Sequence, residues 1–250
     1  MIILLSYGYY GYEGYDGLRF NYSMSGYLFA AIAVMILGLI AQARVKSVYN
    51  KYSQVPISCG RTAASVAAEL LRQNGSSVTI AQISGSLTDN YNPKQGCVSL
   101  SQAVYNSATI GAVAVAAHEC GHVMQYESGY SLIKLRNMIL PVANFGARFS
   151  ILLVLLGLFL GSFGHTVSMI GVVLFGFAVA FQLLTLPVEL DASRRALNML
   201  TAGGYITGAE EEAGARKVLR AAAFTYVVAV LSAVVSFLRL IAIANSTRRR

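Results

Sequence analysis

The sequence has little charge and no tryptophan. Of its 250 residues only 12% are Asp, Glu, Lys or Arg, while 56% are hydrophobic. An ordinary soluble domain has about 25% charged side chains. Such a low content cannot cover the surface of a soluble protein of this length, so a plain soluble globule is excluded. The composition predicts an integral membrane protein with a water-facing part.

Cysteine is also scarce. Cys59, Cys97 and Cys120 are an odd number without CxxC spacing, which excludes a disulfide framework or a Cys-rich zinc site and favours a reducing compartment. The net charge of +8 would suggest nucleic-acid binding in a soluble chain. Here the cations flank apolar segments, as topology signals do, so we expect no nucleic-acid partner.

Charge-free apolar stretches predict four transmembrane helices. Residues 27–43 and 221–238 each suffice for one crossing of the bilayer core, near the lower limit. Residues 149–188 are long enough for two crossings, with a break near residues 161–166, and therefore predict a helical hairpin. Gly157 and Gly161 form a GxxxG pair in the first arm, which we interpret as generic helix packing rather than a dimer interface.

These stretches predict seven segments. They are a Tyr- and Gly-rich N-terminal segment (1–26), transmembrane helix 1 (27–43), a water-facing domain (44–148), the transmembrane hairpin (149–188), water-facing helices (189–220), transmembrane helix 4 (221–244) and a basic tail (245–250). Most Lys and Arg near span ends fall on the side of the two water-facing segments. The positive-inside rule places that side in the cytoplasm, in what we expect to be a bacterial-type cell membrane.

The first water-facing segment predicts a small α+β unit. An amphipathic pattern indicates a helix over residues 62–73. Alternating patterns at 78–83 and 96–101, separated by turn formers at 87–95, indicate two short strands, which we interpret as a β-hairpin. A long apolar helix follows over residues 107–127. The expected fold is mostly α, a multi-pass helical membrane protein with this small domain.

The apolar helix carries the sequence His118-Glu119-Cys120-Gly121-His122. Two imidazoles at positions i and i+4 lie about 40° apart around a helix and can bind one metal ion from a single face. Glu119 lies on the flank of that face, where its carboxylate can exchange a proton with a zinc-activated water. Cys120 points the opposite way, into the core. The motif predicts one zinc ion per chain.

A catalytic zinc needs a third protein ligand. His165 lies at the predicted hairpin tip, across the membrane from the motif, and is excluded. Glu189 follows the hairpin on the same side as the motif, so we predict it as the third ligand, against the alternative that it merely caps a helix. Asp191 is a candidate helix N-cap or an acid supporting the ligands, with capping favoured.

Several stretches of the chain resemble the YugP-type neutral zinc metallopeptidases, a membrane family with an HtpX-like layout. They are residues 87–93, 98–101, 104–105, 113–122, 186–193 and 221–226. The resemblance covers most of the chain after the first span. It implies a gluzincin-like domain in which His118, His122 and Glu189 bind zinc and Glu119 is the catalytic base.

The same resemblance suggests roles for three further elements. In the wider clan an aspartate stands four residues after the ligand Glu, whereas Ser193 occupies that position here. Residues 97–101 would form an edge strand along which an extended peptide pairs before cleavage. Tyr226 either donates a hydrogen bond to a developing oxyanion or is an ordinary interfacial tyrosine.

The leading hypothesis is therefore a membrane-embedded zinc endopeptidase with Glu119 as general base and acid. Its partners would be the lipid bilayer and peptide or protein substrates, membrane-associated ones included. The alternative is a catalytically silent, zinc-stabilised membrane scaffold or partner-binding protein. A metal transporter is disfavoured because the predicted spans contain no acidic residue.

Overall fold

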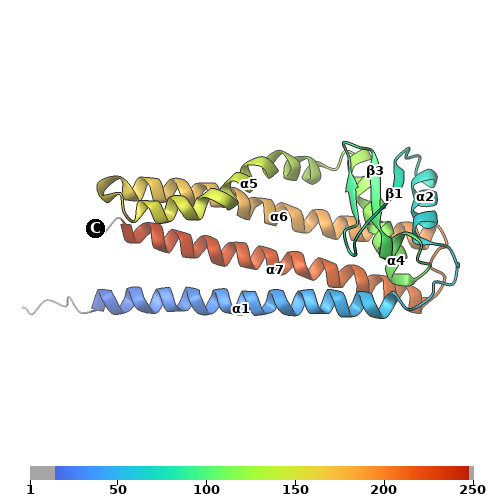
Figure 1. Ribbon diagram of the computed structural model, residues 1–250, viewed down its shortest axis with the longest axis horizontal. Coiled ribbons are helices and arrows are strands. Elements are labelled where there is room, and N and C mark those ends of the chain that lie inside the picture. The colour runs from blue at the N-terminus through green and yellow to red at the C-terminus, as the bar shows by residue number, and fades with distance from the viewer. Residues whose placement is uncertain (1–14, 248–250) are drawn as a thin grey trace, which may run out of the picture.

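Long apolar helices make up most of the chain. The structure is a computed structural model and describes residues 15–247. Four long helices run along the molecule and a small mixed unit sits at one end of them (Figure 1). The long helices are α1 (Tyr15–Tyr52), α5 (Ser131–Gly157), α6 (Gly164–Ala202) and α7 (Ala209–Thr247). The small unit contains α2 (Ala63–Gln73), β1 (Thr79–Ile83), β2 (Asn90–Asn92), β3 (Cys97–Ser101), α3 (Gln102–Tyr105) and α4 (Ile110–Glu127).

Within the described residues, four helical segments are long and apolar enough to cross a membrane, as the sequence predicted. They are Gly26–Tyr52, Ser131–Gly157, Gly161–Ala202 and Ala209–Ser246. Each extends beyond its charge-free stretch, because a helix can continue into water once its apolar part ends. Helix α1 starts at Tyr15, inside the predicted N-terminal segment. Residues 1–14 of that segment and the three terminal arginines lie outside the described residues.

Helices α5 and α6 form a helical hairpin whose turn lies close to the predicted break. Helix α5 ends at Gly157, a short 3-10 turn covers Gly161–Phe163, and α6 begins at Gly164. The GxxxG pair does not form a helix face, because Gly161 lies beyond the end of α5 with φ +53°. Gly157 instead packs within the chain, where an added Cβ would collide with Ser168 of α6.

Small residues let the two arms of the hairpin approach closely. A Cβ on Gly146 of α5 would clash with the carbonyl oxygen of Leu174, and one on Gly171 of α6 would lie 2.7 Å from the carbonyl oxygen of Ser150. Pro141 lies inside α5, where it lacks the backbone N–H that would donate a helical hydrogen bond. The helix bends on its way from the small unit to α6 (Figure 1). Backbone contact between the arms thus occurs in the part of α5 after the bend.

The small unit is built around α4. Thr62 and Thr109 cap α2 and α4 by accepting hydrogen bonds from the backbone N–H groups of Ser65 and Ala112. Most of α4 is buried, including the run from Ile110 to Ala114. The predicted helices in this segment are therefore confirmed to within a few residues.

The predicted β-hairpin needs correction. The sheet has three strands in the order β1-β3-β2, with β1 parallel and β2 antiparallel to β3. The hairpin joins β2 and β3, because the stretch expected to be only a turn also contains strand β2. Tyr91 of β2 packs edge-to-face on Tyr126 of α4. Asn92 accepts a hydrogen bond from the backbone N–H of Lys94 and starts the tight turn.

The prediction that Cys97–Ser101 is an edge strand is wrong. This segment is β3, which lies between β1 and β2, so neighbouring strands of the chain already pair with both of its sides. A substrate peptide cannot add to it by strand pairing along residues 97–101. Sequence alternation alone cannot distinguish a central strand from an edge strand, because the order depends on how β2 folds back.

We expect Gly146→Ala to destabilise the hairpin, because its methyl group would press on the α6 backbone. Overpacking of this kind costs roughly 1–3 kcal/mol. The midpoint of thermal unfolding in detergent, followed by circular dichroism, should fall. Gly26→Ala is the matched control, because nothing lies within 4 Å of its added Cβ. Equal midpoints for both variants would contradict the close α5–α6 packing.

Candidate metal centre

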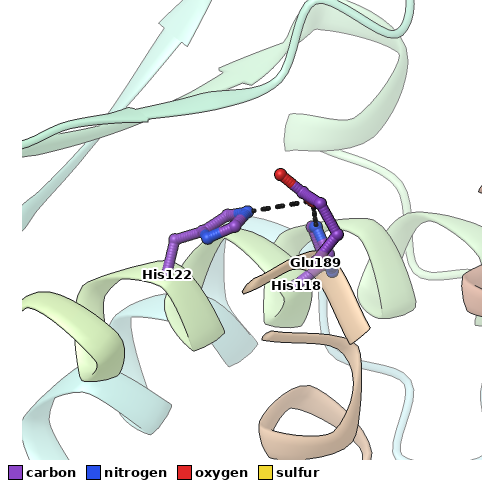
Figure 2. Close-up of side chains that lie close together, drawn as sticks. All are labelled: His118, His122 and Glu189. Atoms are coloured by element: carbon purple, nitrogen blue, oxygen red, sulfur yellow. Dashed lines mark hydrogen bonds and ion pairs between the residues drawn. The ribbon is translucent and has the colours of Figure 1, made fainter. Parts of the chain in front are cut away.

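The centre forms where α4 crosses α6. Gly121 of α4 faces the α6 backbone, and a Cβ there would lie 2.5 Å from the carbonyl oxygen of Ala192. A larger residue would therefore separate the two helices. The neighbouring residues His118 and His122 project from the same part of α4 toward Glu189 of α6 (Figure 2).

Three potential ligand atoms converge on one point. The Nε2 atoms of His118 and His122 lie 3.2 Å and 3.4 Å from Oε2 of Glu189. Ligand atoms of the three residues all lie within 4.8 Å of one another. The imidazole rings stand nearly perpendicular, at 83°. The structure thus brings together the three residues predicted as ligands. His118 and Glu189 are 71 residues apart in the sequence.

Each histidine is held through its second ring nitrogen. Nδ1 of His118 lies 3.2 Å from the Ser193 hydroxyl, and Nδ1 of His122 lies 3.0 Å from Oε1 of Gln125. The amide nitrogen of buried Gln125 donates to the Val188 carbonyl and to Asp191. Because Oε1 can only accept, Nδ1 of His122 carries a proton. Nδ1 is therefore engaged away from the centre, and Nε2 is the ring nitrogen that faces Glu189.

Asp191 does not cap a helix, contrary to the favoured prediction. Helix α6 runs without a break through Pro187, so Glu189 and Asp191 both lie in its interior. Asp191 instead accepts hydrogen bonds from Gln125, Arg194 and Arg195. Pro187 lies inside α6, and the helix continues through it.

Sequence reasoning missed Gln125 and gave Ser193 no role. Gln125 is fully buried and lies one helical turn after His122. Its signal was a polar side chain in an otherwise apolar helix, three residues after a predicted ligand. Ser193 lies one turn after Glu189, which places its hydroxyl at the same face of α6. It contacts His118 from the position where the wider clan has an aspartate.

A pocket of about 210 Å³ opens beside the three residues. Glu119, Ser193 and Tyr226 line it together with His118 and Glu189. Tyr226, at the start of the last apolar stretch, therefore faces the pocket. His165 lies near the end of α7, 3.1 Å from the Ala244 carbonyl oxygen, and does not reach the centre.

Burial shapes the acid–base properties of the α4 side chains. It raises the pKa of Glu119, and the nearby His118 and His122 offset only part of this rise. For His122, burial lowers the pKa, but the contact with the Glu189 carboxylate outweighs it and the net shift is upward. Burial also raises the pKa of the Cys120 thiol. Cys120 faces the core, 3.7 Å from the Ala67 carbonyl oxygen, as its helical angle predicted.

We expect Cys120 to be inert toward thiol reagents in the folded protein, because only an accessible thiolate reacts. Cys59 and Cys97 are half-buried and should react with N-ethylmaleimide. Intact mass spectrometry should find two labels on the native protein and three after denaturation. Cys120→Ala is the control that should remove only the third label. Three labels on the native protein would contradict the buried position.

Two comparisons relate the chain to known proteins. Residues 27–245 match a family model described as “Putative neutral zinc metallopeptidase”. The chain is 43% identical over 218 residues to “Putative membrane protease YugP” of Bacillus subtilis (strain 168), covering 87% of this chain and 96% of that protein. No solved structure matches the chain significantly. The family match extends over most of the sequence, and on this ground the chain belongs to the neutral zinc metallopeptidase family.

Proposed function

We propose that the protein is a membrane-embedded, zinc-dependent endopeptidase in which Glu119 acts as general base and acid. The observation that carries the proposal is the convergence of His118, His122 and Glu189 on one point beside Glu119. The printed name of the relative, a membrane protease, supports peptides or proteins as substrates. The four apolar helices support a site close to the lipid bilayer.

The donor set fits one Zn²⁺ ion. Two imidazole nitrogens and one carboxylate oxygen are a ligand set of catalytic zinc sites, which leave a further position open. Ser193 and Gln125 contact the Nδ1 atoms, so both Nε2 atoms face Glu189, where the ion would bind. When bound, zinc would lower the pKa of a water molecule and polarise the substrate carbonyl. The family assignment supports zinc over other divalent metals.

The chain's own residues would move the protons. Glu119 lines the pocket beside the ligands, so its carboxylate can take a proton from the attacking water and return it to the leaving amine. Its raised pKa suits a group that must both accept and release a proton near neutral pH. Tyr226, which lines the same pocket, can donate a hydrogen bond to the substrate carbonyl oxygen as negative charge develops.

The arrangement also supports a gluzincin-like domain split between the water-facing segments 44–148 and 189–220. An HExxH helix followed by a ligand glutamate on a later helix is the pattern of that group. All four long helices have the small unit at the same end (Figure 1). Because most span-flanking Lys and Arg gather at this end, we assign it to the cytoplasm.

Metal content tests the ligand set. Purified wild-type protein in detergent should contain about one zinc per chain by elemental mass spectrometry. His118→Ala and Glu189→Ala should each lose it, because two remaining ligands hold the ion poorly. Zinc retained by Glu189→Ala would overturn the choice of third ligand.

Glu119→Gln separates an enzyme from a scaffold. This variant should keep its zinc but lose cleavage of an unfolded protein such as fluorescein-labelled casein, because the amide cannot accept the proton. A scaffold that binds zinc without catalysis would cleave nothing in either form. Unchanged cleavage by Glu119→Gln would contradict its role as the base.

The side chains that hold the histidines should tune zinc affinity. Gln125→Leu leaves Nδ1 of His122 without an acceptor, and Ser193→Ala removes the hydroxyl that contacts Nδ1 of His118. Loss of such a partner weakens metal binding about 10- to 100-fold, measurable by competition with a zinc-selective chelating dye. Cys59→Ser is the control, remote from the centre. Affinities equal to wild type would show that these contacts do not orient the ligands.

A further inference from the structure

A second pocket lies between α6 and α7, next to the catalytic one. Its volume is about 240 Å³, and it shares Ser193 with the catalytic pocket. Besides Ser193, three arginines and an asparagine provide its polar lining: Arg194, Asn198, Arg216 and Arg220. Among the described residues, no carboxylate lines this arginine pocket. Its chemistry is therefore that of an anion site.

The positive charge of the arginine pocket is only partly compensated. Arg194 contacts Asp191, but that carboxylate also accepts from Arg195. Arg216 lies 2.5 Å from Glu212, in a pair with both side chains well exposed, where ion pairs contribute little. Arg220 forms no ion pair with any residue that the structure describes. Arg194 is thus held by a buried carboxylate, whereas Arg216 and Arg220 have no buried partner among the described residues and can turn to an incoming anion.

The arginines lie at the level expected for lipid headgroups. Arg194 follows the end of the charge-free stretch at Val188 by less than two helical turns. Arg220 directly precedes the start of the last charge-free stretch at Ala221, and Arg216 lies one turn before it. All three therefore lie just outside the hydrocarbon layer that the apolar helices define.

An apolar surface continues from the arginine pocket toward the membrane. On α6, Leu190 and Leu183 are 49% and 51% exposed and lie four and eleven residues before Arg194, on the same face of the helix. On α7, Val227 and Leu231 are 37% and 45% exposed and continue the face of Arg220. Positive charge above exposed hydrocarbon matches a molecule with an anionic head and apolar tails.

We propose that the arginine pocket binds the headgroup of an anionic phospholipid. The phosphodiester would accept hydrogen bonds from Arg194 of α6 and from Arg216 and Arg220 of α7, while the acyl chains lie along the leucines below. A free phosphate would leave the apolar surface uncovered. An acidic peptide would bind the arginines but has no acyl chains to cover that surface. The bound lipid joins α6, which carries Glu189, to α7, which carries Tyr226.

Native mass spectrometry of the full-length protein in detergent tests the binding. Added phosphatidylglycerol should give a complex with one retained lipid per chain. Phosphatidylcholine, with the same tails but no net charge, should bind at least about tenfold more weakly. Inorganic phosphate at millimolar concentration should not displace the bound lipid. Equal retention of both lipids, or displacement by phosphate alone, would overturn the proposal.

Two double variants locate the site. Arg216→Gln with Arg220→Gln should weaken phosphatidylglycerol binding about 10- to 30-fold, since each basic residue contributes to headgroup attraction. Arg44→Gln with Lys46→Gln removes the same charge at the same end of the molecule, outside the arginine pocket, and should have little effect. Equal losses in both variants would show only a general attraction of charge and would refute a defined site.

The variants are expected to fold, because Arg216 and Arg220 are exposed, and circular dichroism checks their helix content. The single change Arg220→Gln serves if the double variant is unstable. If a Glu-rich peptide binds in a way that depends on Arg216 and Arg220, and phosphatidylglycerol does not bind, the lipid proposal is overturned. The occupant of the pocket would then be an acidic peptide. Lipid binding is measured without zinc or cleavage, so this test and that of the proposed peptidase activity can fail independently.

Discussion

The close approach of α4 and α6 is the contact on which the rest of the site depends. Gly121 allows the α4 surface to touch the α6 backbone at Ala192. Only at this separation does one carboxylate oxygen of Glu189 reach the Nε2 atoms of both histidines. A side chain at position 121 would push α6 outward and move Glu189 away from His118 and His122, although no ligand had changed.

Buried polar groups then orient the ligands at this crossing. Gln125 connects His122 of α4 with Asp191 and the Val188 carbonyl of α6, while Ser193 reaches back to His118. Each contact joins the two helices and also orients an imidazole. Such groups are costly to bury unpaired, so the satisfied network favours one arrangement of α4 against α6. The same side chains thus serve both packing and metal chemistry.

Helices α6 and α7 each contribute both to the apolar helix bundle and to the candidate site. Helix α6 extends from the hairpin, where small residues pack it on α5, to Glu189 and Ser193. Helix α7 begins at the end of the molecule that holds the small unit, lines the pocket at Tyr226 and continues along the apolar helices. The candidate site is therefore built on the same helices that are long and apolar enough to cross a membrane.

Much of this protein could be predicted from local sequence. Charge-free length predicted the four apolar helices, because crossing a bilayer demands it. Helical spacing predicted that His118 and His122 share one face of α4 and that Cys120 faces the core, because the geometry of one helix is known in advance. Glu189 could be nominated because topology returns the chain to the same side after the hairpin.

Other features depended on contacts between distant segments. The continuity of α6 through Pro187 removed the cap predicted at Asp191, and the strand around Tyr91 made β3 central instead of an edge. The contacts of Gln125 and Ser193 with the histidines exist only once α4 and α6 have crossed. Local sequence specifies the elements and the chemical groups they carry, whereas the partner of each group depends on packing between elements far apart in the chain.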